Sequence, residues 1–563
     1  MTKPATDPHG TTAARVLQVL AAADVSTVFG LPGAHNLSFW AGSDQDDQGL
    51  GVIGVDGAPM RSVRIVGVRH EQTAAFAADG WARATGGLGV ALVTSGPGAA
   101  NTLAAFGEAA ASGSPVLVIA SDVPEGPRVR HRPSQRPGAL LHESPDQGGM
   151  FAPLAKAVLQ PTTPEAAVEA AALAVQTALE HPRGPVYLGI PSDVLAAAAP
   201  AGPRPDVLDP PPVDPTDLTA AVDLLNHAER PLLWVGGGVV ASGAVDAVVD
   251  LAWRLGAPVI TTFAARGVLP PAHPLLVDAP PHEPEVSALV READVMLALG
   301  TAFDGMTTRN AQMPMSPCLI DVNLDPSGTY DADLTIVGDV RRVADALAVR
   351  LAARDPWADA PYDIGGRVRR AIADDPRTAD VPPLLTAIAE WPDDGVVVCD
   401  MAVAGYWVGG YAQVSRPRRL LYPVGWGTLG FGLPAAIGAA HRGSPVLAVV
   451  GDGGLAMVLG ELATVVQERL PVTVLLVDDQ GYGMLRFDQD RDGDLHRGVD
   501  LLGPNWLTVA QSFGLPAAEV TATTLGPALA AAGRGRAPSM LVWSTALYPP
   551  RTTSPRWVDQ PAS

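Results

Sequence analysis

The sequence predicts an α/β protein with three domains, each built on a doubly wound parallel sheet. Two observations lead to this prediction: apolar strand patterns alternate with helical patterns along the chain, and two segments unsuited to regular structure divide it. The Pro-rich segment Pro200–Pro215 is expected to be a linker, and a second break runs through Asp355–Asp363. We therefore expect domains over residues 1–185, 186–355 and 356–563.

The best-defined part of this pattern is a strand–helix–strand segment in the last domain. Pro445–Val450 and Pro471–Val477 are short, almost wholly apolar segments, and Leu455–Leu470 between them has apolar residues at helical spacing. Strands that are apolar on both faces are typical of a parallel sheet covered by helices. Ligands of such sheets bind beyond the carboxyl ends of the strands.

Charge and composition exclude several classes of protein. The chain has 563 residues and a formal net charge of −21, which argues against binding to nucleic acid or to anionic membranes. The two cysteines, Cys318 and Cys399, cannot form a disulfide framework. No apolar segment approaches the ~20 residues that cross a bilayer, and the N-terminus lacks the apolar core of a signal peptide. We expect a cytoplasmic protein.

A carboxylate follows each of the two strands in the last domain. Asp452, within Gly451-Asp452-Gly453, follows the first strand, and Asp479 follows the second. Neighbouring strand ends would place these oxygen ligands together, as Mg²⁺ bound to a diphosphate requires. A helix that begins at the motif would offer backbone N–H groups to the same anion. The alternative is a simple turn, because Asp-Gly is common in turns.

The segments GDGGLAMVLGELATVV and LPVTVLLVDDQGYGMLR together resemble the thiamine diphosphate motif of the acetolactate synthase and 2-oxo acid decarboxylase superfamily. The resemblance implies thiamine diphosphate and Mg²⁺ as cofactors, with the Asp452 carboxylate, the Asp479 side chain and the Gly481 carbonyl as metal ligands. Asp479 stands where the family usually has Asn, which adds a negative charge. The cofactor-binding residues implied in this segment are Gly451, Asp452, Gly453, Gly454, Asp479, Gly481, Tyr482, Gly483 and Met484.

The first domain resembles the N-terminal region of acetolactate synthase over VGVRHEQTAAFAADGWARATGGLGVALVTSGPG. In that family the Glu after His contacts N1′ of the cofactor's aminopyrimidine, and the corresponding residue is Glu71. By sharing a proton with N1′ it favours the tautomer whose 4′-nitrogen removes the C2 proton of the thiazolium. Without the resemblance, a charge at a helix N-terminus would be the simpler interpretation of Glu71.

Two loops of the first domain are expected beside the substrate. The turn Thr94–Gly98, which contains Ser95, follows a strand and precedes a helix. The segment LHESPDQ resembles a substrate-side loop of acetolactate synthase and oxalyl-CoA decarboxylase. It makes His142 and Glu143 candidate proton donors or acceptors and Gln147 a candidate substrate contact; the alternative is a solvated polar loop. Neither the histidine of benzoylformate decarboxylase in this turn nor the His-His pair of pyruvate decarboxylases is found, which argues against those two kinds of enzyme.

The last domain supplies three further candidates. YPVGWGTLGFGLPAAIG resembles the segment that holds the cofactor bent, so Leu429 would separate its two rings and the Gly427 carbonyl would accept a hydrogen bond from the 4′-amino group. Arg486 could bind a substrate carboxylate, or pair with Asp488 or another acid. Acetolactate synthases are apolar or aromatic near these charged positions, which argues against authentic acetolactate synthesis for branched-chain amino acids.

The sequence of the middle domain leaves open whether a second cofactor binds there. Residues 236–238 form a Gly-rich turn after a strand, without the full GxGxxG pattern of dinucleotide sites. Members of the family bind FAD, ADP or no ligand in this domain, so FAD stays an open expectation.

The resemblance covers nearly the whole chain and implies decarboxylation of a 2-oxo acid, with carboligation of its acyl group to a second carbonyl. Two alternatives remain: a non-ligating 2-oxo acid or acyl-CoA decarboxylase, and a non-catalytic regulatory or scaffold subunit that retains the fold. In the family the catalytic Glu and the metal ligands come from different subunits, so a homodimer or homotetramer is expected. The expected partners are a small 2-oxo acid and a carbonyl acceptor.

Overall fold

The structure, a computed structural model, describes residues 10–41, 63–126, 140–210, 212–357 and 363–550. The chain divides into two compact units, each formed by three segments: 1–209, 425–443 and 458–470 in the first, and 210–424, 444–457 and 471–563 in the second. The first unit contains one sheet and the second contains two. All pairings between the named strands are parallel, which confirms the predicted α/β class with three parallel sheets.

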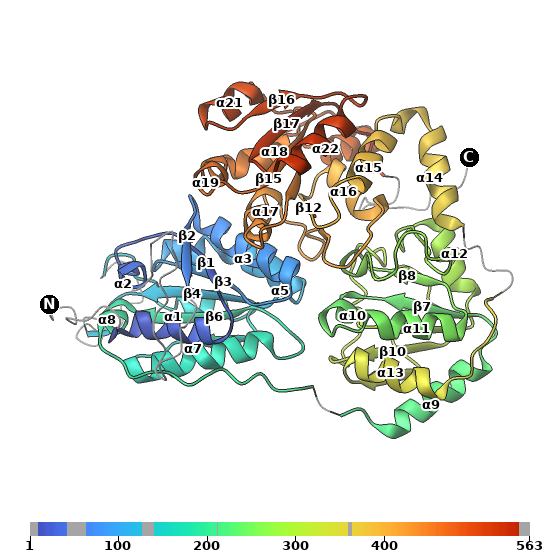
Figure 1. Cartoon of the computed structure of the whole chain (residues 1–563), viewed down its shortest axis with the longest axis horizontal. Helices are drawn as coiled ribbons and strands as arrows, with labels where there is room; N and C mark the ends of the chain where they lie inside the picture. Colours follow the sequence, from blue (N-terminus) through green and yellow to red (C-terminus); the bar gives the residue numbers. More distant parts are fainter. Residues whose placement is uncertain (1–9, 42–62, 127–139, 211, 358–362, 551–563) are drawn as a thin grey trace. The chain divides into compact units, whose positions relative to one another are not determined.

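The sheet of the first unit has the strand order β2-β1-β3-β4-β6-β5, and Figure 1 shows α1 and α7 on one of its faces and α3 and α5 on the other. Its strands are β1 (Thr27–Gly30), β2 (Arg64–Gly67), β3 (Gly89–Val93), β4 (Val116–Asp122), β5 (Ala157–Leu159) and β6 (Val186–Pro191). Its helices are α1 (Thr12–Ala22), α2 (Leu37–Ala41), α3 (Glu71–Thr85), α4 (Pro97–Ala100), α5 (Leu103–Ala111), η2 (Gly148–Met150), α7 (Pro164–Leu179) and α8 (Ser192–Ala196).

The first sheet extends past the domain boundary that we placed between residues 185 and 186. β6 lies beyond that boundary and pairs with both β4 and β5, so it belongs to the first sheet. The described residues between 199 and 214 form no helix or strand, as expected of a Pro-rich linker. The sheet therefore ends at the Pro-rich segment and not at the predicted boundary between residues 185 and 186.

Three helical elements from late in the sequence complete the first unit: α17 (Gly432–Ala440), η5 (Leu459–Glu461) and α19 (Leu462–Gln467). Helix α17 packs against α3 at very short range. A Cβ atom at Gly80 would overlap the carbonyl group of Ala435, and one at Gly438 would overlap that of Ala77. Glycine at both positions therefore permits the backbones of the two helices to touch.

The second unit begins with a five-stranded sheet in the order β11-β10-β9-β7-β8. Its strands are β7 (Pro231–Val235), β8 (Val259–Thr261), β9 (Val295–Leu299), β10 (Leu319–Asn323) and β11 (Leu334–Val337). Its helices are α9 (Pro215–His227), α10 (Gly237–Ala241), α11 (Val245–Leu255), η3 (Phe263–Ala265), α12 (Pro284–Glu292) and α13 (Val340–Arg350). The Gly-rich turn packs on the loop after β9, since Gly236 N donates to Leu299 O at 2.9 Å and Gly238 N donates to Gly300 O at 2.8 Å.

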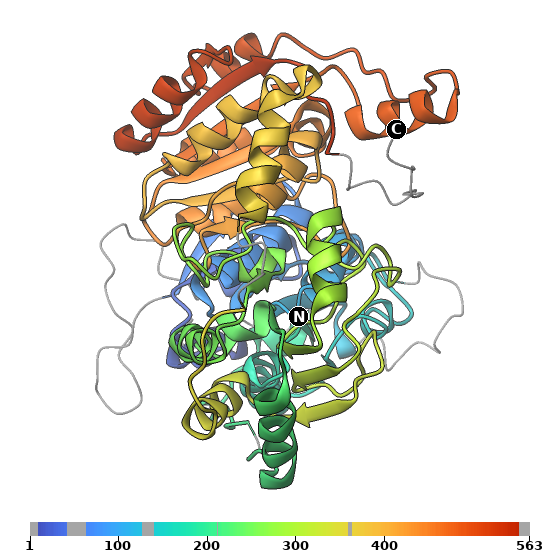
Figure 2. The ribbon, with the colours of Figure 1, turned by 90° about the vertical axis from the view of Figure 1, so that its right-hand side faces the viewer.

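The third sheet has the order β13-β12-β14-β15-β17-β16. Its strands are β12 (Val396–Cys399), β13 (Leu420–Leu421), β14 (Val446–Gly451), β15 (Val472–Asp478), β16 (Ala517–Glu519) and β17 (Ser539–Ser544). Its helices are α14 (Ile364–Asp374), η4 (Pro376–Thr378), α15 (Val381–Ala389), α16 (Val403–Tyr411), α18 (Asp452–Met457), α20 (Gly483–Asp492), α21 (Trp506–Ser512) and α22 (Leu525–Gly535). In Figure 2 the gold helices α14 and α15 lie over the orange strands, with which they share one apolar core.

The predicted strands at 445–450 and 471–477 correspond to β14 and β15, but the single helix expected between them is divided into α18, η5 and α19. Val458 interrupts it with φ −127° and ψ 22°, which lie outside the helical region. Apolar spacing alone does not predict such a break, because the apolar residues before and after Val458 keep the sequence spacing of one continuous helix. No helix in the described ranges is long and apolar enough to cross a membrane.

Candidate active site

Two carboxyl groups meet at the carboxyl end of the third sheet. β14 and β15 are parallel neighbours in which Gly451 pairs with Val477, so Asp452 and Asp479 follow the strands at nearly adjacent positions. Their side chains are close enough to affect each other's pKa. Asp452 is only 2% exposed, and its Oδ1 has no hydrogen-bond partner among the residues that the structure describes.

The electrostatics of this pair suit a divalent cation. Burial raises the pKa of Asp452 well above its ordinary value, and the neighbouring Asp479 and Asp478 raise it further. Burial also raises the pKa of Asp479, although Arg486 opposes that effect. A cation bound by both carboxylates would stabilise their ionised forms and give the buried oxygen a partner.

The remaining metal ligands would not be acidic or imidazole side chains. Within the described ranges, no group of three or more His, Cys, Asp and Glu side chains could hold a metal. The Gly481 carbonyl, which accepts no hydrogen bond from the described residues, is available. One or two carboxylates, a backbone oxygen, phosphate and water make up a usual Mg²⁺ site, so the residues present fit this ion.

Glycines at the start of α18 allow two side chains to approach its backbone closely. A Cβ atom at Gly453 would lie 2.6 Å from the Tyr482 ring, and one at Gly454 would lie 2.6 Å from Oδ2 of Asp400. Asp400 is buried directly after β12, the neighbour of β14, and our sequence analysis missed it. The rule that singled out Asp452, a polar residue just after an apolar strand, would have found it.

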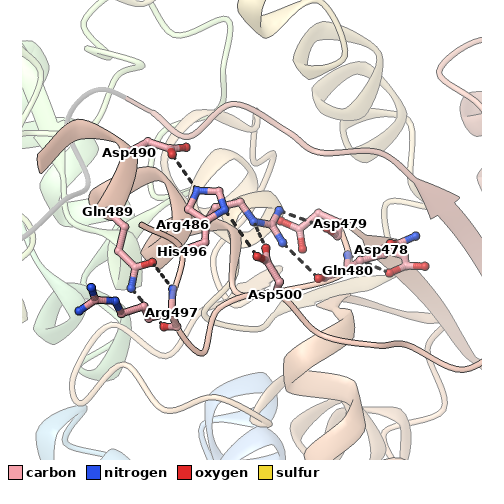
Figure 3. Close-up of polar contacts among 9 residues, drawn as sticks. All are labelled: Asp478, Asp479, Gln480, Arg486, Gln489, Asp490, His496, Arg497 and Asp500. Carbon is pink, nitrogen blue, oxygen red and sulfur yellow. Dashed lines mark hydrogen bonds and ion pairs between the residues drawn. The ribbon is translucent and has the colours of Figure 1, made fainter. Parts of the chain in front are cut away.

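Arg486 lies across the loop that carries Asp479 and Gln480 (Figure 3). Its Nη1 donates to Asp479 O at 3.2 Å, its Nη2 to Gln480 O at 3.1 Å, and its Nε to Oδ1 of Asp500 at 2.9 Å. Of the two roles we considered, the structure therefore shows pairing with an acid. That acid is Asp500 rather than Asp488, which lies 3.7 Å from Arg491.

In the first unit, Glu71 begins α3 just beyond the end of β2. Its side chain is buried, and Oε2 accepts a hydrogen bond from Asn101 Nδ2 at 3.0 Å. His70 is the N-cap of the helix, and its ring accepts from Gln72 N at 3.2 Å. His70 thus has a structural role, while Asn101, which the sequence analysis missed, fixes one oxygen of Glu71.

Gln147 holds the turn that contains Ser95. Its Oε1 accepts from Gly96 N at 2.6 Å, and its Nε2 lies 2.9 Å from Ser121 O and 2.7 Å from the Tyr187 hydroxyl. Gln147 is 1% exposed, so both ends of its amide serve buried hydrogen bonds. This arrangement accounts for Gln147 as a support of the turn.

The two candidate proton-transfer residues of the next loop have different surroundings. His142 is exposed and lies against His35, with ring centroids 5.6 Å apart. Glu143 is half-buried, and its Oε2 accepts from Leu140 N at 3.3 Å. The sequence analysis missed His35, whose Nδ1 lies 2.5 Å from Ser95 Oγ. His35 follows β1, so the strand-end rule could have found it as well.

The segment with Gly427 and Leu429 belongs to the first unit and is anchored on Glu108. Oε2 of this buried carboxylate accepts from Trp426 N and from Thr428 Oγ1, each at 3.1 Å. Gly427 adopts a φ of +70°, which favours glycine. Hydrogen bonds within the first unit therefore hold this turn in place, and Leu429 is half-buried within it.

Comparisons with known proteins bear on both groups of residues. A model of the thiamine pyrophosphate enzyme N-terminal TPP-binding domain matches residues 10–140, that of the central domain matches 218–347, and that of the C-terminal TPP-binding domain matches 400–542. The domains therefore occur in the predicted order. The N-terminal match contains Glu71 and Ser95, while His142, Glu143 and Gln147 lie just beyond its end. The C-terminal match contains Gly427, Leu429 and the candidate metal ligands.

Whole-chain similarity agrees with these matches. The chain is 38% identical to a protein of Pseudomonas aeruginosa named "Probable 2-ketoarginine decarboxylase", over 84% of this chain and 83% of that one. It is 29% identical to the probable acetolactate synthase large subunit of Methanocaldococcus jannaschii, over 89% and 86% of the two chains. It is also 29% identical to acetolactate synthase isozyme 3 large subunit of Escherichia coli, over 87% and 86%. The resemblance found in the sequence is confirmed.

Proposed function

The chain belongs to the thiamine pyrophosphate enzymes, and on that premise we propose that it decarboxylates a 2-oxo acid with thiamine diphosphate held by Mg²⁺. The observation that carries the proposal is the buried Asp452–Asp479 pair with its unpartnered oxygen. Such a pair is costly in a metal-free protein and favourable around a cation.

The second unit would hold the metal and the diphosphate. Asp452, Asp479 and the Gly481 carbonyl would bind Mg²⁺, and Gly453 and Gly454 at the start of α18 would lie beside the phosphate groups. Arg486 fixes the carbonyls of Asp479 and Gln480, so the loop enters the site in one conformation. When bound, thiamine diphosphate supplies the electron sink for cleavage of the bond to the carboxylate.

The first unit would hold the aminopyrimidine. Asn101 occupies Oε2 of Glu71, which leaves Oε1 to hold a proton against a ring nitrogen. Leu429 and the Gly427 carbonyl stand on the turn that Glu108 anchors, and they would support the bent cofactor. His142 and Glu143 remain candidates for proton transfer, and Ser95 for a substrate contact.

We further propose that the active protein is a homodimer or a dimer of dimers. Glu71 and the metal ligands lie in different units of the chain, and in this family they come from different subunits. Each site would then combine the first unit of one subunit with the second unit of its partner.

Two fates of the acyl group follow from the relatives. The acetolactate synthase names favour carboligation to a second carbonyl, as the sequence analysis expected. The name of the relative at 38% identity favours release of an aldehyde without ligation. That second candidate also suggests 2-ketoarginine as a substrate to test.

A substrate screen tests the proposal. The protein is incubated with Mg²⁺, thiamine diphosphate and one 2-oxo acid at a time, with pyruvate and 2-ketoarginine among them, and CO₂ is measured with and without an added aldehyde. We expect CO₂ release from at least one acid and a product that shows which fate applies. If the protein bound the cofactor but released CO₂ from none, a non-catalytic subunit would become the better account.

A further inference from the structure

The carboxyl end of the first sheet carries a pair of histidines, His35 and His142, of which only His142 has so far been given a candidate role. Strands β2, β1 and β3 are consecutive in the sheet, and Glu71, His35 and Ser95 follow them in that order. His142 comes from the segment after β4 and meets His35 at the same edge. The pair therefore lies on the same edge of the sheet as the carboxylate that would serve the cofactor.

His35 is held in a defined orientation. Its Nδ1 lies 2.5 Å from the hydroxyl of Ser95, which is fully buried. Its Nε2 makes no hydrogen bond within the described ranges, and the ring is half-buried. Burial lowers the pKa of His35, His142 lowers it further, and Asp122 opposes both effects. One nitrogen is thus anchored while the other is free to exchange a proton.

His142 is held by the same turn. A Cβ atom at Gly96 would overlap the His142 carbonyl, so the loop can approach the turn only over a glycine. His142 itself has a φ of +66°, which costs a non-glycine residue free energy and persists only where its surroundings impose it. Its ring is exposed and meets the ring of His35 edge-on, at an interplanar angle of 71°.

The turn also connects the pair to Glu71. A Cβ atom at Gly98 would lie 3.3 Å from Oε1 of Glu71, while Ser95 in the same turn contacts His35. The oxygen of Glu71 that Asn101 leaves unoccupied is therefore the one that faces this turn. Glu71 and the histidine pair are thus joined through one turn, Thr94–Gly98.

We propose that His35 is a catalytic residue, the proton donor that releases an aldehyde product, with His142 as its link to solvent and Ser95 as a positioning residue. The inference rests on the decarboxylase function proposed above. The bond from the 2-oxo carbon to the carboxylate breaks as CO₂ leaves, and a C–H bond forms at that carbon with a proton from Nε2 of His35. His35 regains the proton from solvent through His142, so the overall change is one 2-oxo acid and one proton to one aldehyde and CO₂.

The proposal makes the fate of the acyl group depend on His35. Protonation of the carbon ends the reaction as an aldehyde, whereas attack on a second carbonyl forms a new C–C bond. Without the donor, protonation of the carbon slows, and a larger share of the acyl group is transferred to the second carbonyl. General acids contribute about 100- to 10,000-fold to a rate, so the effect should be large.

The test compares two assays on His35→Gln, with His35→Asn as a second variant and His227→Gln as a matched surface control. His227 is exposed on α9, where its Nδ1 lies 2.7 Å from the carbonyl oxygen of Asp223. The first assay measures aldehyde release from the substrate found in the screen. The second measures CO₂ release with 2,6-dichlorophenolindophenol, a two-electron acceptor that diverts the product to the carboxylic acid, so that no C–H bond has to form.

We expect His35→Gln to lower aldehyde release at least about 100-fold, to lower dye-coupled CO₂ release by less than about threefold, and to increase the share of ligated product when an acceptor aldehyde is present. Calorimetry should show unchanged thiamine diphosphate affinity. Equal losses in the two assays, or no loss in either, would overturn the role of His35. Failure of the proposed decarboxylase function would instead appear in the unmodified protein, as absent CO₂ release in both assays.

A readout without cofactor tests the pair itself. In protein labelled with ¹³C at the histidine rings, His142→Gln should raise the pKa of His35, because His142 lowers it in the unmodified chain. An unchanged titration of His35 would show that the rings do not interact, and would remove His142 from the relay.

Discussion

Glu108 in the first unit and Asp452 in the second are both buried carboxylates, but their surroundings differ. Glu108 pairs with Arg83 at 3.2 Å and accepts hydrogen bonds from Trp426 and Thr428. Burial alone would raise the pKa of Glu108, but these partners hold it below its ordinary value. Asp452 faces other acids, and its pKa is raised. The first carboxylate is satisfied within the chain, whereas we propose that the second needs a cation from outside.

The largest expected effect tests whether Asp452 binds a cation. Asp452→Ala removes the buried metal ligand, so we expect Mg²⁺-dependent binding of thiamine diphosphate to fall below detection in calorimetry, and turnover with it. The fold should persist, because the substitution removes one of two apposed buried acids. Unchanged cofactor affinity in this variant would contradict the metal site.

Glu71→Gln should separate binding from chemistry. The variant keeps the size of the side chain and the contact with Asn101 but cannot hold the catalytic proton, so we expect turnover to fall about 100- to 10,000-fold with cofactor affinity retained. The rate of C2-proton exchange in bound thiamine diphosphate, measured by NMR, reports the step directly. Turnover at the unmodified rate would disprove the role of Glu71.

The same two variants test whether sites form between subunits. In a mixed dimer of Glu71→Gln and Asp452→Ala chains, one site carries both changes and the other carries neither. Co-expression should therefore restore about a quarter of the unmodified activity if mixing is random and sites are shared. If each chain formed its own site, no activity would return.

Glu108→Gln should destabilise the first unit rather than act on the chemistry. It weakens a buried ion pair while Arg83 retains Asp79 at 2.6 Å, so we expect a loss of about 2–3 kcal/mol in the free energy of unfolding. Because the folded pKa of Glu108 is depressed, its contribution is present above its ordinary value of 4.5 and is lost as pH falls below it. Urea unfolding at pH 7 and at pH 4 measures both effects; a variant as stable as the unmodified chain at pH 7 would refute the comparison.

Arg486→Met should have a smaller effect on the second unit. The variant frees the carbonyls of Asp479 and Gln480, so we expect Mg²⁺ and cofactor affinity to fall by about 1–2 kcal/mol, roughly five- to thirtyfold. Arg497→Met is the matched control from the same segment, because the side chain of Arg497 makes no hydrogen bond or ion pair in the described ranges. Figure 3 shows it directed away from the cluster. If both variants bound the cofactor equally, Arg486 would not hold the loop.

The smallest expected effect addresses the unusual Asp479. Asp479→Asn removes one of two apposed carboxylates, so the metal-free protein should gain about 1 kcal/mol in the free energy of unfolding. Its Mg²⁺ affinity should fall about tenfold, because the ligand loses its charge. A metal-free variant less stable than the unmodified chain would show that the pair is not repulsive.

Residues that follow strands could be predicted from the sequence. Apolar runs located β14 and β15, and the parallel arrangement brought Asp452 and Asp479 together as expected. Glu71 lies at the end of β2 for the same reason. These positions depend on the local apolar pattern and on the fact that the carboxyl ends of parallel strands lie at one edge of a sheet. A single sequence is therefore enough to infer them.

Contacts between distant loops could not be predicted in this way. No motif reports that His35 and His142 meet, and the absence of adjacent histidines led us to discount a histidine pair. The anchoring of Trp426 on Glu108 likewise joins segments far apart in the sequence. Such contacts depend on how loops close over the sheet edge, which is set by single residues such as Gly96.

The contact of α17 with α3 has a consequence for synthesis on the ribosome. The first unit needs residues 425–443 and 458–470, so it cannot be completed when its own sheet has left the exit tunnel. Until then the glycine-lined surface of α3 around Gly80 has no partner helix. The nascent N-terminal segment must therefore remain open to chaperones, or to aggregation, while most of the remaining chain is translated.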